Sequence, residues 1–179
     1  MTLQEMLEGA QARLEAAGLA YGHGTTNARD EAAWLVLWSL GLPLDSDLDT
    51  LGGDPISPEQ VSAAEALIQR RISTRQPAAY LTREAWLQGV PFYVDERAIV
   101  PRSFIAELIA DGGFDAWLGE DTRAVLDLCT GNGSLAVLTA MAWPEVQVTG
   151  ADLSSDALAV ARINVDRHGL QQRITLVAS

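Results

Sequence analysis

The stretch that decides the fold runs from residue 125 to residue 135 and reads Val-Leu-Asp-Leu-Cys-Thr-Gly-Asn-Gly-Ser-Leu. An apolar strand passes through an acid, Asp127, into a glycine loop, and a helix follows. Gly131 and Gly133 allow a tight turn at positive φ and the close approach of a ligand, while the amides that open the next helix carry partial positive charge. This order of elements is typical of a pocket for a nucleotide-containing cofactor.

A second carboxylate is expected beside the first. Residues 146–152 form another apolar run, which ends on Asp152, and neighbouring strand ends meet in a doubly wound sheet. Asp152 can accept hydrogen bonds from both hydroxyls of a ribose. Asp127 would repel a pyrophosphate but suits an ammonium group, which favours S-adenosylmethionine over NAD. The pattern Gly-x-Gly-x-x-Ala is also formally a dinucleotide fingerprint, and a plain strand-to-helix turn is the non-functional alternative.

Composition excludes several classes of function. The 179 residues carry 24 acids against 12 Lys and Arg, a formal net charge of −12 at pH 7. This charge argues against direct binding of nucleic acid and is compatible with a basic protein partner. The single cysteine, Cys129, excludes a disulfide framework and a zinc cluster, and we expect it to pack rather than react. With no membrane-spanning run and no leader, we expect a soluble, cytoplasmic protein without a metal.

The first 75 residues or so are expected to form a helical bundle. Apolar residues recur at helical spacing over residues 3–14 and 30–40, and we expect Trp34 and Trp38 to belong to the core. Ser57-Pro-Glu-Gln combines an N-cap serine with a proline at the first helical position, which predicts a third helix towards Arg75. The acids of residues 45–54 are expected in a solvated loop. Short apolar runs around Gly89 and Pro91 predict a β-hairpin within residues 80–100.

The rest of the chain predicts a parallel sheet. Strands over 123–128, 146–151 and 173–178 alternate with helices over 133–142 and 155–168. The predicted fold class is therefore a two-part α+β chain: a helical domain over 1–78, a hairpin linker over 79–100, and the first half of a Rossmann-like domain over 101–179. The first of the three strands is left with an open, apolar edge. We therefore expect a fragment of a longer protein, or a half-fold completed by a partner.

Several segments resemble the protein-(glutamine) methyltransferases, which modify release factors or a large-subunit ribosomal protein. Residues 22–32 and Val-Pro-Arg-Ser at 100–103 are similar to the branch that acts on ribosomal protein three. The release-factor branch, which is the alternative, usually has Ile-Pro-Arg-Pro there and glycine where this chain has Cys129. The segments that carry the resemblance to the family as a whole are residues 70–82, 92–97, 100–103 and 127–133.

The resemblance implies a specific chemistry. It implies an S-adenosylmethionine-dependent enzyme that methylates the side-chain amide nitrogen of a glutamine, with a helical substrate-recognition domain before a class I methyltransferase domain. Arg102 and Phe104 are placed at the border of the pocket. The family's catalytic motif, Asn-Pro-Pro-Tyr, has no match before Ser179, so no catalytic residue is assigned and we expect this chain by itself to be inactive. The cofactor-binding residues that the resemblance implies are Asp127, Cys129, Thr130, Gly131, Asn132, Gly133, Asp152 and Leu153.

The sequence leaves three other functions possible. The first is a related methyltransferase with a different acceptor, such as an adenine in nucleic acid, against which the acidic charge weighs. The second is an NAD-dependent oxidoreductase, which Asp127 and the lack of glycine at position 129 disfavour. The third is a non-catalytic binding or assembly module.

Overall fold

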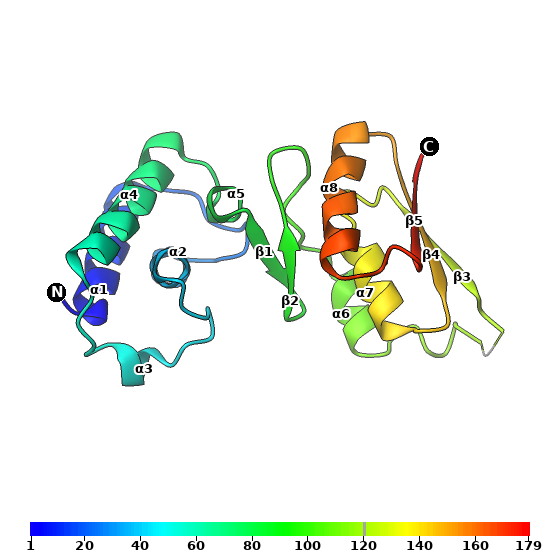
Figure 1. Cartoon of the computed structure of the whole chain (residues 1–179), viewed down its shortest axis with the longest axis horizontal. Helices are drawn as coiled ribbons and strands as arrows, with labels where there is room; N and C mark the ends of the chain where they lie inside the picture. The colour runs from blue at the N-terminus through cyan, green and yellow to red at the C-terminus, as the bar shows by residue number, and fades with distance from the viewer. Residues whose placement is uncertain (120) are drawn as a thin grey trace. The chain divides into compact units, whose positions relative to one another are not determined.

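A computed structural model describes residues 1–119 and 121–179 (Figure 1). The chain forms two compact units, Met1–Thr82 and Arg83–Ser179. The first unit is helical, and the second contains a hairpin, a parallel sheet and helices. The second unit begins at Arg83, within the range 79–100 that was expected to be a linker. The hairpin therefore belongs to the second unit and packs with the residues that follow it. The division into domains at residues 78 and 100 stays a prediction.

The first unit is a bundle built on three long helices that start at capping residues. Ser57 and Gln60 form the predicted capping box at the start of α4, and Thr2 forms another with Glu5 at the start of α1. Asn27 caps α2 by accepting a hydrogen bond from the Asp30 amide. The three helices pack against one another through fully buried leucine and isoleucine side chains. The helices of this unit are α1 (Leu3–Ala16), α2 (Ala28–Leu40), α3 (Leu48–Leu51), α4 (Pro58–Thr74) and α5 (Ala78–Thr82).

Two expectations about this unit are corrected. The acidic stretch 45–54 is not wholly loop, because Asp47 accepts hydrogen bonds from two backbone amides and so starts the short helix α3. Trp34 is buried as predicted, but Trp38 is 40% exposed. Trp38 lies in the last turn of α2, where the bundle covers only part of the indole, and such partial exposure of one apolar residue is ordinary.

A buried ion pair links two helices of the bundle to the loop between α1 and α2. Arg71 of α4 donates to the Glu31 carboxylate of α2 at 2.7 Å, and both side chains are almost fully buried. Arg71 also donates to the carbonyl of Ala20 at 3.0 Å, and the Thr25 hydroxyl donates to Glu31 at 3.1 Å. These bonds fix the loop that enters α2, because a buried charge must be fully paired to be tolerated.

The second unit has the strand–helix alternation that the sequence predicted. The sheet order is β3-β4-β5 with all strands parallel, and β1 pairs with β2 as an antiparallel hairpin. The helices α7 and α8 lie on one face of the sheet (Figure 1). The elements are β1 (Glu84–Leu87), β2 (Val90–Tyr93), α6 (Ile105–Ala110), β3 (Ala124–Leu128), α7 (Ser134–Ala142), β4 (Gln147–Asp152), α8 (Ser155–Arg167) and β5 (Ile174–Ala178).

The register of the sheet brings the strand ends of β3 and β4 together. Asp127 lies opposite Gly150 and Leu128 opposite Ala151, so the carboxyl ends of both strands meet at the same edge. In the described part of the chain β3 is an edge strand, and Leu126 and Leu128 are 57% and 65% exposed. The apolar edge expected from the sequence is therefore present. Within residues 1–119 and 121–179, every helix is too short or too polar to cross a membrane.

Candidate functional site

The site is organised by the turn that joins β3 to α7. The chain passes through positive φ at Cys129 (59°), Gly131 (57°) and Gly133 (79°). A Cβ atom on Gly133 would lie 3.0 Å from Ala161 Cβ and 3.2 Å from Ala161 Cα, so this glycine allows α8 to pack against the turn. A Cβ atom on Gly131 would meet no atom nearer than the carbonyl oxygen of Cys129 at 3.9 Å. The backbone at Gly131 is thus open to a ligand, whereas Gly133 serves the packing of the turn.

Asp152 holds this turn against the end of β4. Its Oδ2 accepts from the Gly131 amide at 2.9 Å, and its Oδ1 accepts from the Ser154 amide at 2.9 Å. The Thr130 amide donates to the carbonyl of Ala151 at 2.9 Å. Each carboxylate oxygen can accept a second hydrogen bond. Asp152 therefore both shapes the loop and keeps the acceptor capacity that a ribose diol needs.

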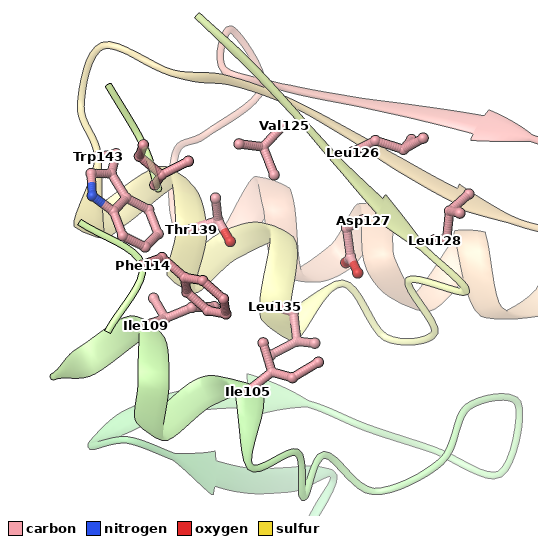
Figure 2. Close-up of a pocket in the computed structure, with 11 residues that line it drawn as sticks. Ile105, Ile109, Phe114, Val125, Leu126, Asp127, Leu128, Leu135, Thr139 and Trp143 are labelled. Carbon is pink, nitrogen blue, oxygen red and sulfur yellow. The ribbon is translucent and has the colours of Figure 1, made fainter. Parts of the chain in front are cut away.

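Asp127 lies on the face of β3 that looks towards α7. Figure 2 shows Val125 and Asp127 projecting from the strand towards this helix. The Thr130 hydroxyl donates to Asp127 Oδ2 at 2.6 Å. Burial raises the pKa of the Asp127 carboxyl, the nearby charge of Asp152 raises it further, and the hydrogen bond from Thr130 opposes the rise. A cation beside Asp127 would favour the charged form of this carboxyl, because an opposite charge lowers the pKa of a carboxyl.

Two cavities adjoin the end of β3. A mostly apolar one of about 360 Å³ lies between α6, β3 and α7 and includes Asp127 (Figure 2). A smaller one of about 250 Å³ lies between the segment 99–103 and the glycine turn. The residues that line the smaller cavity are Ile99, Val100, Pro101, Arg102, Ser103, Cys129, Thr130, Gly131, Asn132, Ser134 and Leu135.

The smaller cavity brings together much of the predicted cofactor site. Arg102 lines it, together with the predicted loop residues from Cys129 to Asn132. The other expected residues do not line it: Asp127 lines the larger cavity, and Gly133, Asp152, Phe104 and Leu153 line neither of the two. Phe104 and Leu153 are 81% and 87% exposed, and their contact with a ligand stays a prediction.

The structure also shows what the sequence analysis missed or misjudged. Val100, Pro101 and Ser103 line the smaller cavity but were not among the expected site residues. The Val-Pro-Arg-Ser motif at 100–103, from which only Arg102 was expected at the pocket, could have pointed to all three. Cys129 is exposed, which corrects the expectation that it packs. The strand ends at Leu128, and the chain leaves the sheet at the positive φ of Cys129, where it is no longer covered. Within the described residues, no group of His, Cys, Asp and Glu side chains could hold a metal ion.

The arrangement can bind a ligand that combines a cation with a diol. Asp127 offers a carboxylate to a cation, and Asp152 offers acceptors to hydroxyl groups. The buried Asn132 side chain leaves its Nδ2 without a hydrogen-bond partner, while its Oδ1 accepts from the Ser134 amide at 3.2 Å. With the open backbone at Gly131, these features fit a cofactor that carries an amino-acid moiety and a ribose.

Comparison with known proteins defines the class. Residues 125–179 match the family model described as a methyltransferase domain, and residues 5–82 match the model described as the PrmC N-terminal domain. The second unit thus contains residues of a methyltransferase domain, and its parallel strands alternate with helices as in a Rossmann-like fold. A solved structure, the tRNA (uracil-54, C5)-methyltransferase of Pyrococcus abyssi, is 19% identical over 52% of this chain and 23% of its own, and its TM-score of 0.39 is too low to support an inference.

Curated relatives define the family more closely. The ribosomal protein uL3 glutamine methyltransferase of Burkholderia pseudomallei is 51% identical over 98% of this chain and 57% of its own length. The proteins of the same name from Bordetella pertussis and Neisseria meningitidis serogroup B are 50% and 47% identical, again over 98% of this chain. The chain belongs to the protein-(glutamine) methyltransferase family, as the resemblance predicted. It spans between 57% and 59% of the length of these relatives.

Proposed function

We propose that this protein uses S-adenosylmethionine to methylate the side-chain amide nitrogen of a glutamine in ribosomal protein uL3. The observation that carries the proposal is the identity of about half of all residues, over 98% of the chain, with proteins of that name. These names favour the ribosomal-protein branch over the release-factor branch, and the methyltransferase model favours this class over an NAD-dependent oxidoreductase.

The turn and its two carboxylates would hold the cofactor. Asp152 would accept hydrogen bonds from the ribose hydroxyls, and Asp127 would face the ammonium group of the methionine moiety. Gly131 leaves room for the cofactor to touch the backbone, and Arg102 would border the pocket. When bound, S-adenosylmethionine supplies an electrophilic methyl group on a sulfonium.

Positioning is the main task of such a site. A glutamine amide is a weak nucleophile, so holding its nitrogen in line with the methyl group supplies much of the rate. We assign no catalytic residue within residues 1–179 and give this chain the role of holding the cofactor. The helical unit would recognise the substrate protein.

The charge of the chain supports a basic protein as partner. A net charge of −12 attracts a basic surface and repels the phosphates of nucleic acid. We therefore propose that the protein binds the ribosomal protein itself rather than RNA. We also propose that the reaction takes place in the cytoplasm.

Calorimetric titration of S-adenosylmethionine into this chain tests the cofactor assignment. We expect binding that weakens about 10- to 100-fold in Asp152→Ala, because hydrogen bonds to a charged group are lost. Asp156→Ala is the matched control, since Asp156 is an exposed acid in the first turn of the neighbouring helix α8. Binding of NAD without binding of S-adenosylmethionine would contradict the proposal.

A further inference from the structure

Asn164 of α8 is fully buried and forms hydrogen bonds with two separate segments of the second unit. Its Oδ1 accepts from the Tyr93 amide at 2.7 Å, and its Nδ2 donates to the Tyr93 carbonyl at 2.9 Å. Nδ2 also donates to the carbonyl of Asn132 at 2.8 Å. A single side chain thus bonds to the end of β2 and to the glycine turn.

The chemistry of an asparagine side chain matches these partners. An amide group has two N–H donors and a carbonyl acceptor, and Asn164 uses both donors on carbonyl oxygens and the acceptor on an N–H. An aspartate of the same shape would place a second acceptor against two carbonyls. An alanine would leave the polar groups of Tyr93 and Asn132 buried without these partners.

The two segments that Asn164 joins lead to opposite walls of the smaller cavity. On one side, Asn132 belongs to the turn that Asp152 holds from β4. On the other side, the Tyr93 hydroxyl donates to Asp95 at 2.9 Å, and Asp95 accepts from the Arg97 guanidinium at 2.6 Å. The chain then continues to the segment 99–103, which forms the facing wall.

We propose that Asn164 is a positioning residue for the cofactor site, because it sets the spacing between the turn 129–133 and the segment that runs from Tyr93 to Ser103. It acts through the Asn132 and Tyr93 backbones and need not touch the ligand. The identity of the ligand rests on the function proposed above, while the effect on the turn does not. Substitution of Asn164 loosens the turn and weakens the binding of the cofactor.

The test compares Asn164→Asp with Val165→Ala in this chain. Val165 is the next residue on α8, is fully buried in the core of the unit, and serves as a control for lost stability. Titration with S-adenosylhomocysteine measures affinity, and NMR amide exchange without ligand measures protection of the Gly131 and Gly133 amides. Both amides donate hydrogen bonds in the turn, to Asp152 and to the carbonyl of Thr130.

We expect Asn164→Asp to weaken binding about tenfold or more and to speed exchange at both amides. We expect Val165→Ala to lower the melting temperature but to change the affinity by less than about twofold. Equal weakening by the two variants at equal loss of melting temperature would overturn the proposal, as would unchanged exchange at the turn. Asn164→Ala takes the place of Asn164→Asp if the aspartate variant does not fold.

The affinity titration and the amide-exchange measurement together separate the positioning role of Asn164 from the function on which it rests. If the wild-type chain does not bind S-adenosylhomocysteine, the cofactor assignment fails, and the exchange comparison still judges the role of Asn164. If the wild type binds and exchange at the turn is unaffected by Asn164→Asp, the positioning role fails and the cofactor assignment stands.

Discussion

Gly133→Ala should destabilise the second unit far more than the same change two residues earlier. Both Gly131 and Gly133 have positive φ, so alanine brings a similar backbone strain to each. They differ in their surroundings. The new methyl group at Gly133 would lie 3.0 Å from Ala161 Cβ and 3.2 Å from Ala161 Cα, whereas the one at Gly131 would reach only the carbonyl of Cys129 at 3.9 Å.

The size of the difference follows from these distances. Left-handed backbone costs an alanine about 1–2 kcal/mol, which both variants bear. Overpacking against a fixed backbone adds about 1–3 kcal/mol, which only Gly133→Ala bears, because the contact with Ala161 Cα cannot be relieved by a rotamer change. The lower chain entropy of alanine in the unfolded state offsets about 0.4–1 kcal/mol in both variants. We therefore expect Gly133→Ala to be less stable than Gly131→Ala by about 1–3 kcal/mol.

Native-state hydrogen exchange followed by mass spectrometry can measure this difference within the unit that carries the substitution. Peptides from residues 124–178 report the free energy of opening of the sheet and its helices, and peptides from Met1–Thr82 serve as an internal control. Equal loss of protection in the two variants would refute the argument, since it would mean that α8 yields to the new methyl group at little cost. A larger effect in Gly131→Ala would refute it as well.

Two further predictions concern buried charges. Arg71→Met should lower the free energy of unfolding of the helical unit by about 3–5 kcal/mol in urea, because Glu31 stays buried without its partner, and adding Glu31→Leu should recover most of this loss. The hydrogen bond from Arg97 lowers the pKa of Asp95 to about 2 from its ordinary value of 3.8. The stability contributed by Asp95 is therefore present above pH 3.8 and is lost as the pH falls through about 2. The stability deficit of Asp95→Asn should thus be constant from pH 7 to about 4 and shrink below that range, and a deficit independent of pH would contradict the assignment.

Local signals in the sequence accounted for most of the secondary structure. The capping box at Ser57 and the strand–helix alternation after residue 123 act over a few residues, and their elements begin and end within about a residue or two of the predicted bounds. The short helices α3 and α5 were missed, because one or two turns leave no periodic pattern. The exposure of Trp38 was missed because burial depends on which neighbours cover a side chain.

The candidate site likewise has one part that the sequence predicts and one part that it does not. The glycine turn and its two acids could be predicted because strand ends in a parallel sheet must meet, and the register of β3 and β4 confirms their meeting. The facing wall at residues 99–103 could not be derived from spacing, since it depends on where the chain goes after the hairpin.

The sequence by itself determined the class of fold, the glycine turn and the choice of acids at the ends of the strands, because these follow from periodicity and from backbone conformations that few residues can adopt. Only the tertiary structure decided that Asn164 bonds to both Tyr93 and Asn132, that Ala161 leaves no room for a side chain at Gly133, and that Arg71 pairs with Glu31. The partners in these contacts lie 28 to 71 residues apart along the chain, counting 161 − 133 and 164 − 93. Contacts at such separations arise from packing, and no local pattern of residues encodes them.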